Sequence, residues 1–178
     1  MIIYIVIGVA IILIFSIISL IFLISKNKVN KENIKITEVK AQINQLLNKK
    51  KLLLSDIKEE LGDQKKILDG IENVDDYADN DFEYNDKLRE YYKRFYKLIH
   101  SDEYIDVNKK SEDFNKLFFL IKEEEEALSG CIKYYNDKAD QYNILISSFP
   151  VKFVSVFCNY KKLDLYNIEK IEFLDILK

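Results

Sequence analysis

The sequence predicts an all-α protein in which an N-terminal transmembrane helix is followed by an antiparallel bundle of long helices. Residues 2–25 contain no charged side chain, and the apolar residues that follow recur at alternating intervals of three and four. No two alternating segments are joined by a turn signal, so a sheet is not expected. We therefore predict a transmembrane anchor (1–25), a cytoplasmic helical bundle (26–150), and a C-terminal strap with a short helix packed on the bundle (151–178).

The first 25 residues predict a single membrane span. A helix rises about 1.5 Å per residue, so the 24 uncharged residues extend over roughly 36 Å, enough to cross a hydrocarbon core of about 30 Å. A cleaved signal peptide is the alternative, but the segment has no charged start, is too long, and is not followed by a small-residue cleavage pattern.

Basic residues flank this span on one side only, which predicts its orientation. Because lysine and arginine are retained on the cytoplasmic side, we expect a single-pass protein of the cell membrane, with its N-terminus outside and its body cytoplasmic. Two isolated cysteines agree with a reducing compartment. The membrane-flanking basic residues that carry this prediction are Lys26, Lys28, Lys31 and Lys35.

The first helix of the body is expected from about Asn30 to about Glu72, with a coiled-coil-like seam interrupted at Lys50 and Gln64. An acidic connection, residues 72–86, follows it, because these residues are weakly periodic. The apolar residues of the seam are Ile36, Val39, Ile43, Leu46, Leu53, Ile57, Leu61, Leu68 and Ile71.

Two further helices are expected after this connection. The second stops near 101–102, and the third is ended by Pro150, because proline disfavours a helical residue before it. Residues 151–160 fit a short helix or an extended strap, and residues 165–177 a last amphipathic piece. The second stripe comprises Leu88, Tyr91, Tyr92, Phe95, Leu98 and Ile99; the third comprises Phe114, Leu117, Ile121, Leu128, Cys131, Tyr135, Tyr142, Leu145 and Phe149.

Isolated polar residues offer weak signals for catalysis. His100 ends a predicted helix, where a solvated or capping role is expected. Cys131 and Cys158 lie 27 residues apart without a metal-binding spacing, and Cys131 is expected to be a small buried residue. The run Glu123–Glu126 is interpreted as a solvated charge run with one register-setting glutamate. Consecutive helical residues point all round the helix, so at most two of the four could face inward.

Two Tyr-Asn pairs near the C-terminus are more informative. Tyr135-Asn136 and Tyr142-Asn143 lie seven residues apart, so both tyrosines share one helix face, and the amides beside it are expected to fix the register of the bundle. A peptide-binding tyrosine edge is the alternative. Phe149-Pro150 and an aromatic tail ending in Lys161-Lys162 follow. Residues 131–162 thus resemble the signature of the bacterial LemA family.

This resemblance implies a membrane-anchored antiparallel helical bundle with no established enzymatic activity and no expected cofactor. The chain departs from the family pattern at Ser55-Asp56, at Ile132 and at Cys158–Tyr160, which indicates a divergent member.

The expected function is that of a non-enzymatic scaffold or adaptor that contacts the lipid bilayer and docks an unidentified protein partner. Residues 26–51 carry eight Lys and two Glu, whereas residues 52–86 carry three Lys and twelve acids, and these separated charges suit docking. The net charge of −3 argues against a nucleic acid. Two alternatives stay open: a homo-oligomer, and a metal-binding enzyme that uses Glu123–Glu126 with Asp56, Glu59 and Glu60.

Overall fold

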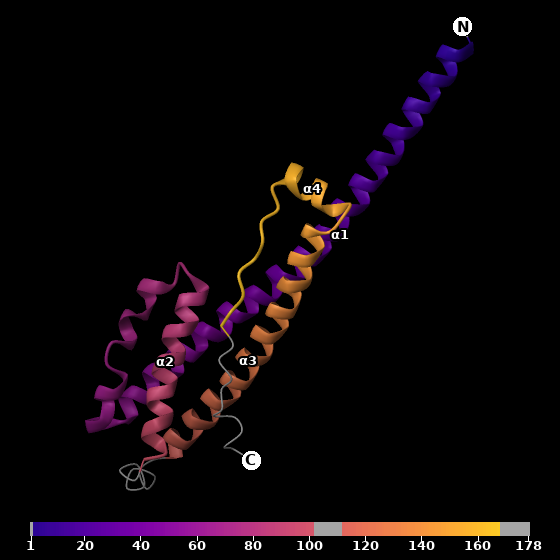
Figure 1. Ribbon diagram of the computed structural model, residues 1–178. Helices are drawn as coiled ribbons and strands as arrows, with labels where there is room; N and C mark the ends of the chain where they lie inside the picture. Colours follow the sequence, from indigo (N-terminus) through magenta and orange to yellow (C-terminus); the bar gives the residue numbers. More distant parts are fainter. Residues whose placement is uncertain (1, 102–111, 168–178) are drawn as a thin grey trace. The chain divides into compact units, whose positions relative to one another are not determined.

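A computed structural model of the chain describes residues 2–101 and 112–167. Every regular element in this part of the chain is helical, which confirms the predicted all-α fold (Figure 1). Four α-helices and two 3₁₀ helices follow one another as α1 (Ile2–Glu60), η1 (Gly62–Leu68), η2 (Ile71–Tyr77), α2 (Asp81–Ile99), α3 (Glu112–Ser147) and α4 (Val151–Cys158).

The helices form two compact units, and α1 and α3 contribute residues to both. Unit 1 is formed from Met1–Glu38 and Tyr135–Leu165, and unit 2 from Val39–Tyr134 and Tyr166–Lys178, as far as these ranges are described.

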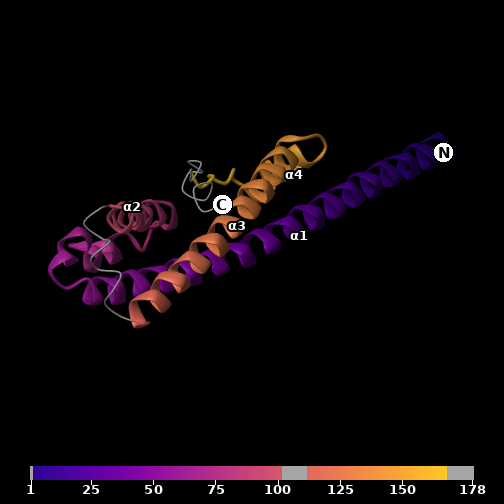
Figure 2. The ribbon, with the colours of Figure 1, turned by 90° about the horizontal axis from the view of Figure 1, so that it is seen from below.

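Unit 1 packs the end of α3 and the short helix α4 on the first part of α1. The two views show the end of α3 beside α1, with α4 turning back from it (Figures 1 and 2). Along α1, Ser25 is the first buried residue, and it follows a stretch of mostly exposed apolar side chains. The apolar core of unit 1 comprises Val29, Ile36, Tyr135, Ala139, Tyr142, Ile146, Val151 and Val154.

Unit 2 combines the second part of α1 with η1, η2, α2 and the first part of α3. The side chain of Asn80 caps α2 by accepting hydrogen bonds from the backbone N–H groups of Phe82 and Glu83, at 3.2 and 3.5 Å. Helix α2 packs on η1 and η2. The apolar core of unit 2 includes Ile43, Leu47, Leu54, Ile57, Leu68, Ile71, Leu88, Phe95, Ile121 and Leu128.

The first long helix ends earlier than predicted. It stops at Glu60 rather than near Glu72, because Gly62 adopts a left-handed conformation (φ 57°) and begins η1. The apolar pattern continues through η1 and η2, where Leu68 and Ile71 are buried. Their spacing thus indicated burial correctly but did not distinguish an α-helix from two 3₁₀ helices.

Some predictions of side-chain burial were also wrong. Leu47 is fully buried in place of the half-buried Leu46, because an ideal helix repeats every 3.6 residues and drifts away from a strict heptad. Cys131 is half-buried. Phe149 lies in the turn after α3 and is 81% exposed, so it does not belong to the core.

The remaining boundaries agree closely with expectation. Helix α2 ends at Ile99 and α3 ends at Ser147, shortly before Pro150. Residues 151–158 form the short helix rather than the extended strap. Of the last predicted amphipathic piece, residues 165–167 are irregular, and the rest lies outside the described residues.

Candidate functional site

The Tyr-Asn pairs hold the C-terminal segment of unit 1 against α3. The Asn143 side chain donates through Nδ2 to the carbonyl oxygen of Leu163 at 2.9 Å, and its Oδ1 accepts from the Leu163 backbone N–H at 2.8 Å. Asn143 therefore satisfies both backbone groups of one residue, as a neighbouring strand would. The Tyr135 hydroxyl donates to the carbonyl oxygen of Asp164 at 3.2 Å.

The other members of this signature surround these contacts. Tyr142 is buried in the core of unit 1, and desolvation raises its pKa. Asn136 is half-buried on the same helix. Further along the segment, the Tyr160 hydroxyl donates to Oδ1 of Asn30 on α1 at 2.9 Å, and desolvation raises the pKa of Tyr160. The segment is thus attached to both long helices within unit 1.

The start of this segment, α4, presents an aromatic surface. Phe149, Phe153 and Phe157 are 81%, 64% and 80% exposed, and the rings of Phe149 and Phe153 meet edge to face with centroids 6.0 Å apart. The opposite face of α4 is buried through Val151 and Val154. The exposed aromatic side chains line an apolar groove of about 250 Å³, whose full lining is Ile18, Ile21, Phe22, Phe149, Pro150, Phe153, Val154 and Phe157.

The predicted membrane-flanking lysines also lie in unit 1. Lys26, Lys28 and Lys31 are exposed on α1. Lys35 is half-buried and forms an ion pair with Glu32 at 2.9 Å, and this hydrogen bond lowers the pKa of Glu32. Three of the four lysines are therefore open to contact another charged surface.

Unit 2 contains two ion pairs between consecutive residues of α1 and α3. Nζ of Lys50 lies 2.5 Å from Oε2 of Glu125, and the two side chains are only 1% and 5% exposed. The adjacent Lys49 pairs with Glu124. The ammonium group of Lys50 also lies 5.1 Å from the ring centroid of Tyr92, whose pKa is raised by desolvation and further by the charge of Glu125.

These pairs change the interpretation of Glu123–Glu126. Two of the four glutamates are buried, which is the largest number that the helix geometry allows to face inward, and the carboxylate of each is paired with a lysine. The acids considered with them, Asp56, Glu59 and Glu60, are exposed. Within the described residues, no group of three His, Cys, Asp or Glu side chains is arranged to hold a metal ion. The arrangement supports a structural role for this run.

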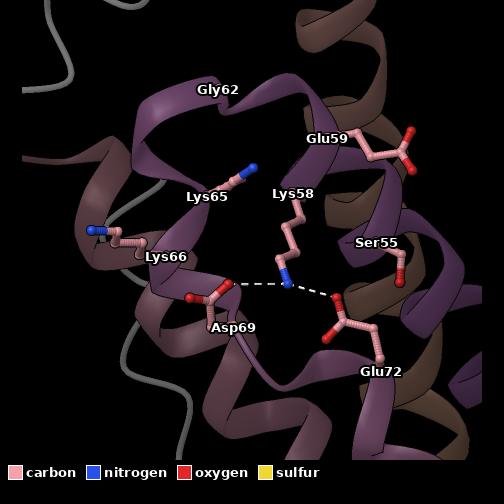
Figure 3. A pocket seen from close by; sticks show the side chains of 8 residues that line it. All are labelled: Ser55, Lys58, Glu59, Gly62, Lys65, Lys66, Asp69 and Glu72. Carbon is pink, nitrogen blue, oxygen red and sulfur yellow. Dashed lines mark hydrogen bonds and ion pairs between the residues drawn. The ribbon is translucent and has the colours of Figure 1, made fainter.

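Unit 2 contains a hollow beside the end of α1 (Figure 3). There Nζ of Lys58 lies between Oδ1 of Asp69 (3.1 Å) and Oε1 of Glu72 (2.6 Å), whereas Lys66 points away from Lys58. The hydrogen bond between Lys58 and Glu72 raises the pKa of the lysine and lowers that of the glutamate. The hollow measures about 1100 Å³ and is lined by Ser55, Lys58, Glu59, Gly62, Lys65, Lys66, Asp69 and Glu72.

The ion pairs at η1 and η2 and the exposed face of α4 were not predicted from the sequence. Lys58 and Glu72 are 14 residues apart on elements of unknown geometry, so no spacing rule connects them. Phe153 and Phe157 could have been recognised from their interval of four residues, which places them on one helix face.

His100 has the predicted capping position. It follows α2, and its Nδ1 lies 2.9 Å from the carbonyl oxygen of Tyr96, on whose ring it stacks at a centroid distance of 4.0 Å.

Comparison with known proteins identifies one family. The family model described as "LemA family" matches residues 35–175, which include both Tyr-Asn pairs, Phe149 and Pro150. No curated protein matches the chain, and no solved structure matches it. The matched stretch extends well beyond the 131–162 signature and covers most of the chain, so the protein belongs to the LemA family.

Proposed function

We propose that this protein is a membrane-anchored, non-enzymatic adaptor whose helical units dock a cytoplasmic protein. The observation that carries the proposal is the exposure of the first part of α1. This segment contains a window with a mean hydropathy of 3.2, none of which is buried. A helix of a water-soluble core would bury one face, whereas a lipid-facing helix is apolar all round.

The lysines that follow support a cytoplasmic location for both units. Lys26, Lys28 and Lys31 are exposed directly after the apolar segment, where they meet the headgroups of anionic lipids at about 1 kcal/mol each. Lysines that follow an apolar segment favour a cytoplasmic location for the part of the chain after it, and therefore an N-terminus outside the cell.

The acidic surface of η2 and of the turn after it is the proposed docking site for the protein partner. Asp75 is exposed although it pairs with Lys51, and Asp76 and Asp79 are exposed beside it. Since this surface belongs to the part of the chain with twelve acids and three lysines, it suits a partner with a basic surface.

Orientation is tested by protease protection of the full chain, tagged at both ends, in intact cells and in inverted vesicles. We expect the C-terminal tag to be protected in cells and cleaved in inverted vesicles. Replacement of Lys26, Lys28, Lys31 and Lys35 by Gln should produce a mixture of orientations. A C-terminal tag cleaved in intact cells would contradict the proposed topology.

Docking is tested by crosslinking in native membranes and mass spectrometry of the products. The variant Asp76→Asn/Asp79→Asn should lose a crosslinked partner that the wild type retains. The matched control, Asp137→Asn/Asp140→Asn, makes the same charge change at exposed positions of unit 1 and should retain it. Identical crosslinks for all three proteins, or crosslinks only between copies of this chain, would contradict docking at this surface.

A further inference from the structure

We propose that α4 and the turn before it lie in the bilayer interface as a second membrane contact, with Phe149, Phe153 and Phe157 among the lipid acyl chains. This inference rests on the proposed membrane span. It assigns the phenylalanine and proline of the signature to a lipid surface.

The apolar groove of unit 1 provides the first argument. One wall is formed by Ile18, Ile21 and Phe22, which belong to the proposed span, and the other by residues from Phe149 to Phe157. If α1 crosses the bilayer at these positions, the side chains that share the groove lie at the same depth. An aqueous position for α4 would then require the span to leave the hydrocarbon at Ile18.

The depth of this contact follows from the rise of the helix. Ser25 is the last residue of the uncharged stretch, and Ile18 and Phe22 precede it by seven and three residues. At about 1.5 Å per residue, these positions lie about 10 Å and about 5 Å inside the boundary. A depth of about 5–10 Å is the depth at which interfacial amphipathic helices bury their apolar faces.

The exposed surface of α4 has the composition that such a position requires. Its two faces differ in what they contact: Val151 and Val154 pack in unit 1, whereas Phe153, Val156 and Phe157 are 64–80% exposed. Together with Phe149, these side chains make four large apolar groups exposed within nine residues. Water-soluble proteins rarely leave such an apolar patch uncovered.

Charge complementarity points to lipid as the occupant rather than a second protein. Lys152 is exposed on α4, and Lys161 and Lys162 are exposed directly after it. Unit 1 contains eight lysines and five acidic residues after the uncharged stretch. Aromatic side chains combined with surrounding lysines are typical of segments that bind anionic bilayers at the interface.

Tryptophan fluorescence tests the proposal directly, because the natural chain contains no tryptophan. The full chain is reconstituted in vesicles of phosphatidylcholine and phosphatidylglycerol, with bromine placed either near the glycerol or near the methyl end of the acyl chains. The variants Phe153→Trp and Phe157→Trp report on α4, and both replace exposed side chains outside the core. Leu13→Trp reports on the span, and Phe119→Trp, exposed in unit 2, is the matched aqueous control.

We expect the α4 tryptophans to be quenched more strongly by bromine near the glycerol, Leu13→Trp by bromine near the methyl end, and Phe119→Trp by neither. Quenching of Leu13→Trp without quenching at positions 153 and 157 would overturn this inference and leave the proposed anchor intact. Absence of quenching at all positions would overturn both. A blue-shifted but unquenched emission at 153 and 157 would show that protein covers the patch, and would also overturn the proposal.

Discussion

The buried ion pair between Lys50 and Glu125 leads to a sharp prediction about stability. Glu125→Leu would leave the ammonium group of Lys50 in a site where its side chain is 1% exposed, with the ring of Tyr92 as a remaining neighbour at 5.1 Å. Lys50→Met would likewise leave a buried carboxylate. Removal of one member of a buried ion pair typically costs about 3–5 kcal/mol, because the other charge stays desolvated.

The double substitution Lys50→Met/Glu125→Leu should behave differently. Nζ of Lys50 and Oε2 of Glu125 are close, but the geometry of their contact does not make a directed hydrogen bond, so the desolvation of both charges is only partly offset. Replacement of such a pair by apolar side chains is neutral or stabilises by about 1–4 kcal/mol. The double variant should therefore be at least as stable as the wild type.

The free energy of unfolding is measured by urea titration of the full chain in mild detergent, followed by circular dichroism at 222 nm. Lys116→Met is the control: its side chain is 63% exposed, and its partners Glu112 and Asp113 are 88% and 79% exposed, so these pairs should contribute less than about 1 kcal/mol. If the two single substitutions at positions 50 and 125 each cost less than about 1 kcal/mol and simply add, the charges are solvated and the reasoning is refuted.

Three further predictions concern both units. Asn143→Ala removes two hydrogen bonds to Leu163 and should cost about 1–3 kcal/mol, with faster hydrogen exchange of the Leu163 amide; unchanged exchange would contradict the contact. Gly70→Ala should destabilise the fold by about 1–3 kcal/mol, because the φ of Gly70 is 89° and an added Cβ would lie 2.9 Å from the hydroxyl oxygen of Tyr91. An unchanged midpoint of thermal unfolding would contradict this prediction. The hydrogen bond with Lys58 lowers the pKa of Glu72, so the stability that this ion pair contributes is present above pH 4.5 and is lost as the pH falls through the pKa of Glu72 in the folded state. Lys58→Met should therefore make the free energy of unfolding, measured by urea titration, less dependent on acid pH. An unaltered dependence would rule out this role of the pair.

The helices were predictable because their signals are local. The uncharged stretch before Lys26, the stripe from Leu88 to Leu98 and the stop at Pro150 each depend on the spacing of neighbouring residues. The end of α1 was not predictable in this way. The apolar spacing of a helix continues past its actual end, through Leu61, Leu68 and Ile71. The positive φ of Gly62, which ends the helix, is visible only in the structure.

The candidate sites were predictable only in part. The signature placed Tyr135 and Asn143 correctly on one helix, but their bonding partners at 163 and 164 lie 20 and 29 residues away in irregular structure. Similarly, the charge of Glu125 was visible in the sequence, whereas its burial depends on the opposing Lys50. The distant partners of polar side chains are set by the tertiary structure, and their separation in the sequence follows no regular spacing.

The attachment of the C-terminal segment has an evolutionary consequence. Asn143 and Tyr135 bind the main chain of residues 163 and 164, so these contacts do not depend on which side chains the segment carries. Substitutions other than proline at position 163, and substitutions at position 164, can therefore accumulate without loss of the attachment, whereas neither the amide of Asn143 nor the hydroxyl of Tyr135 can be replaced by an apolar group. We therefore expect related proteins to differ in the side chains of the C-terminal segment while they retain Tyr135 and Asn143, the two residues that hold the segment.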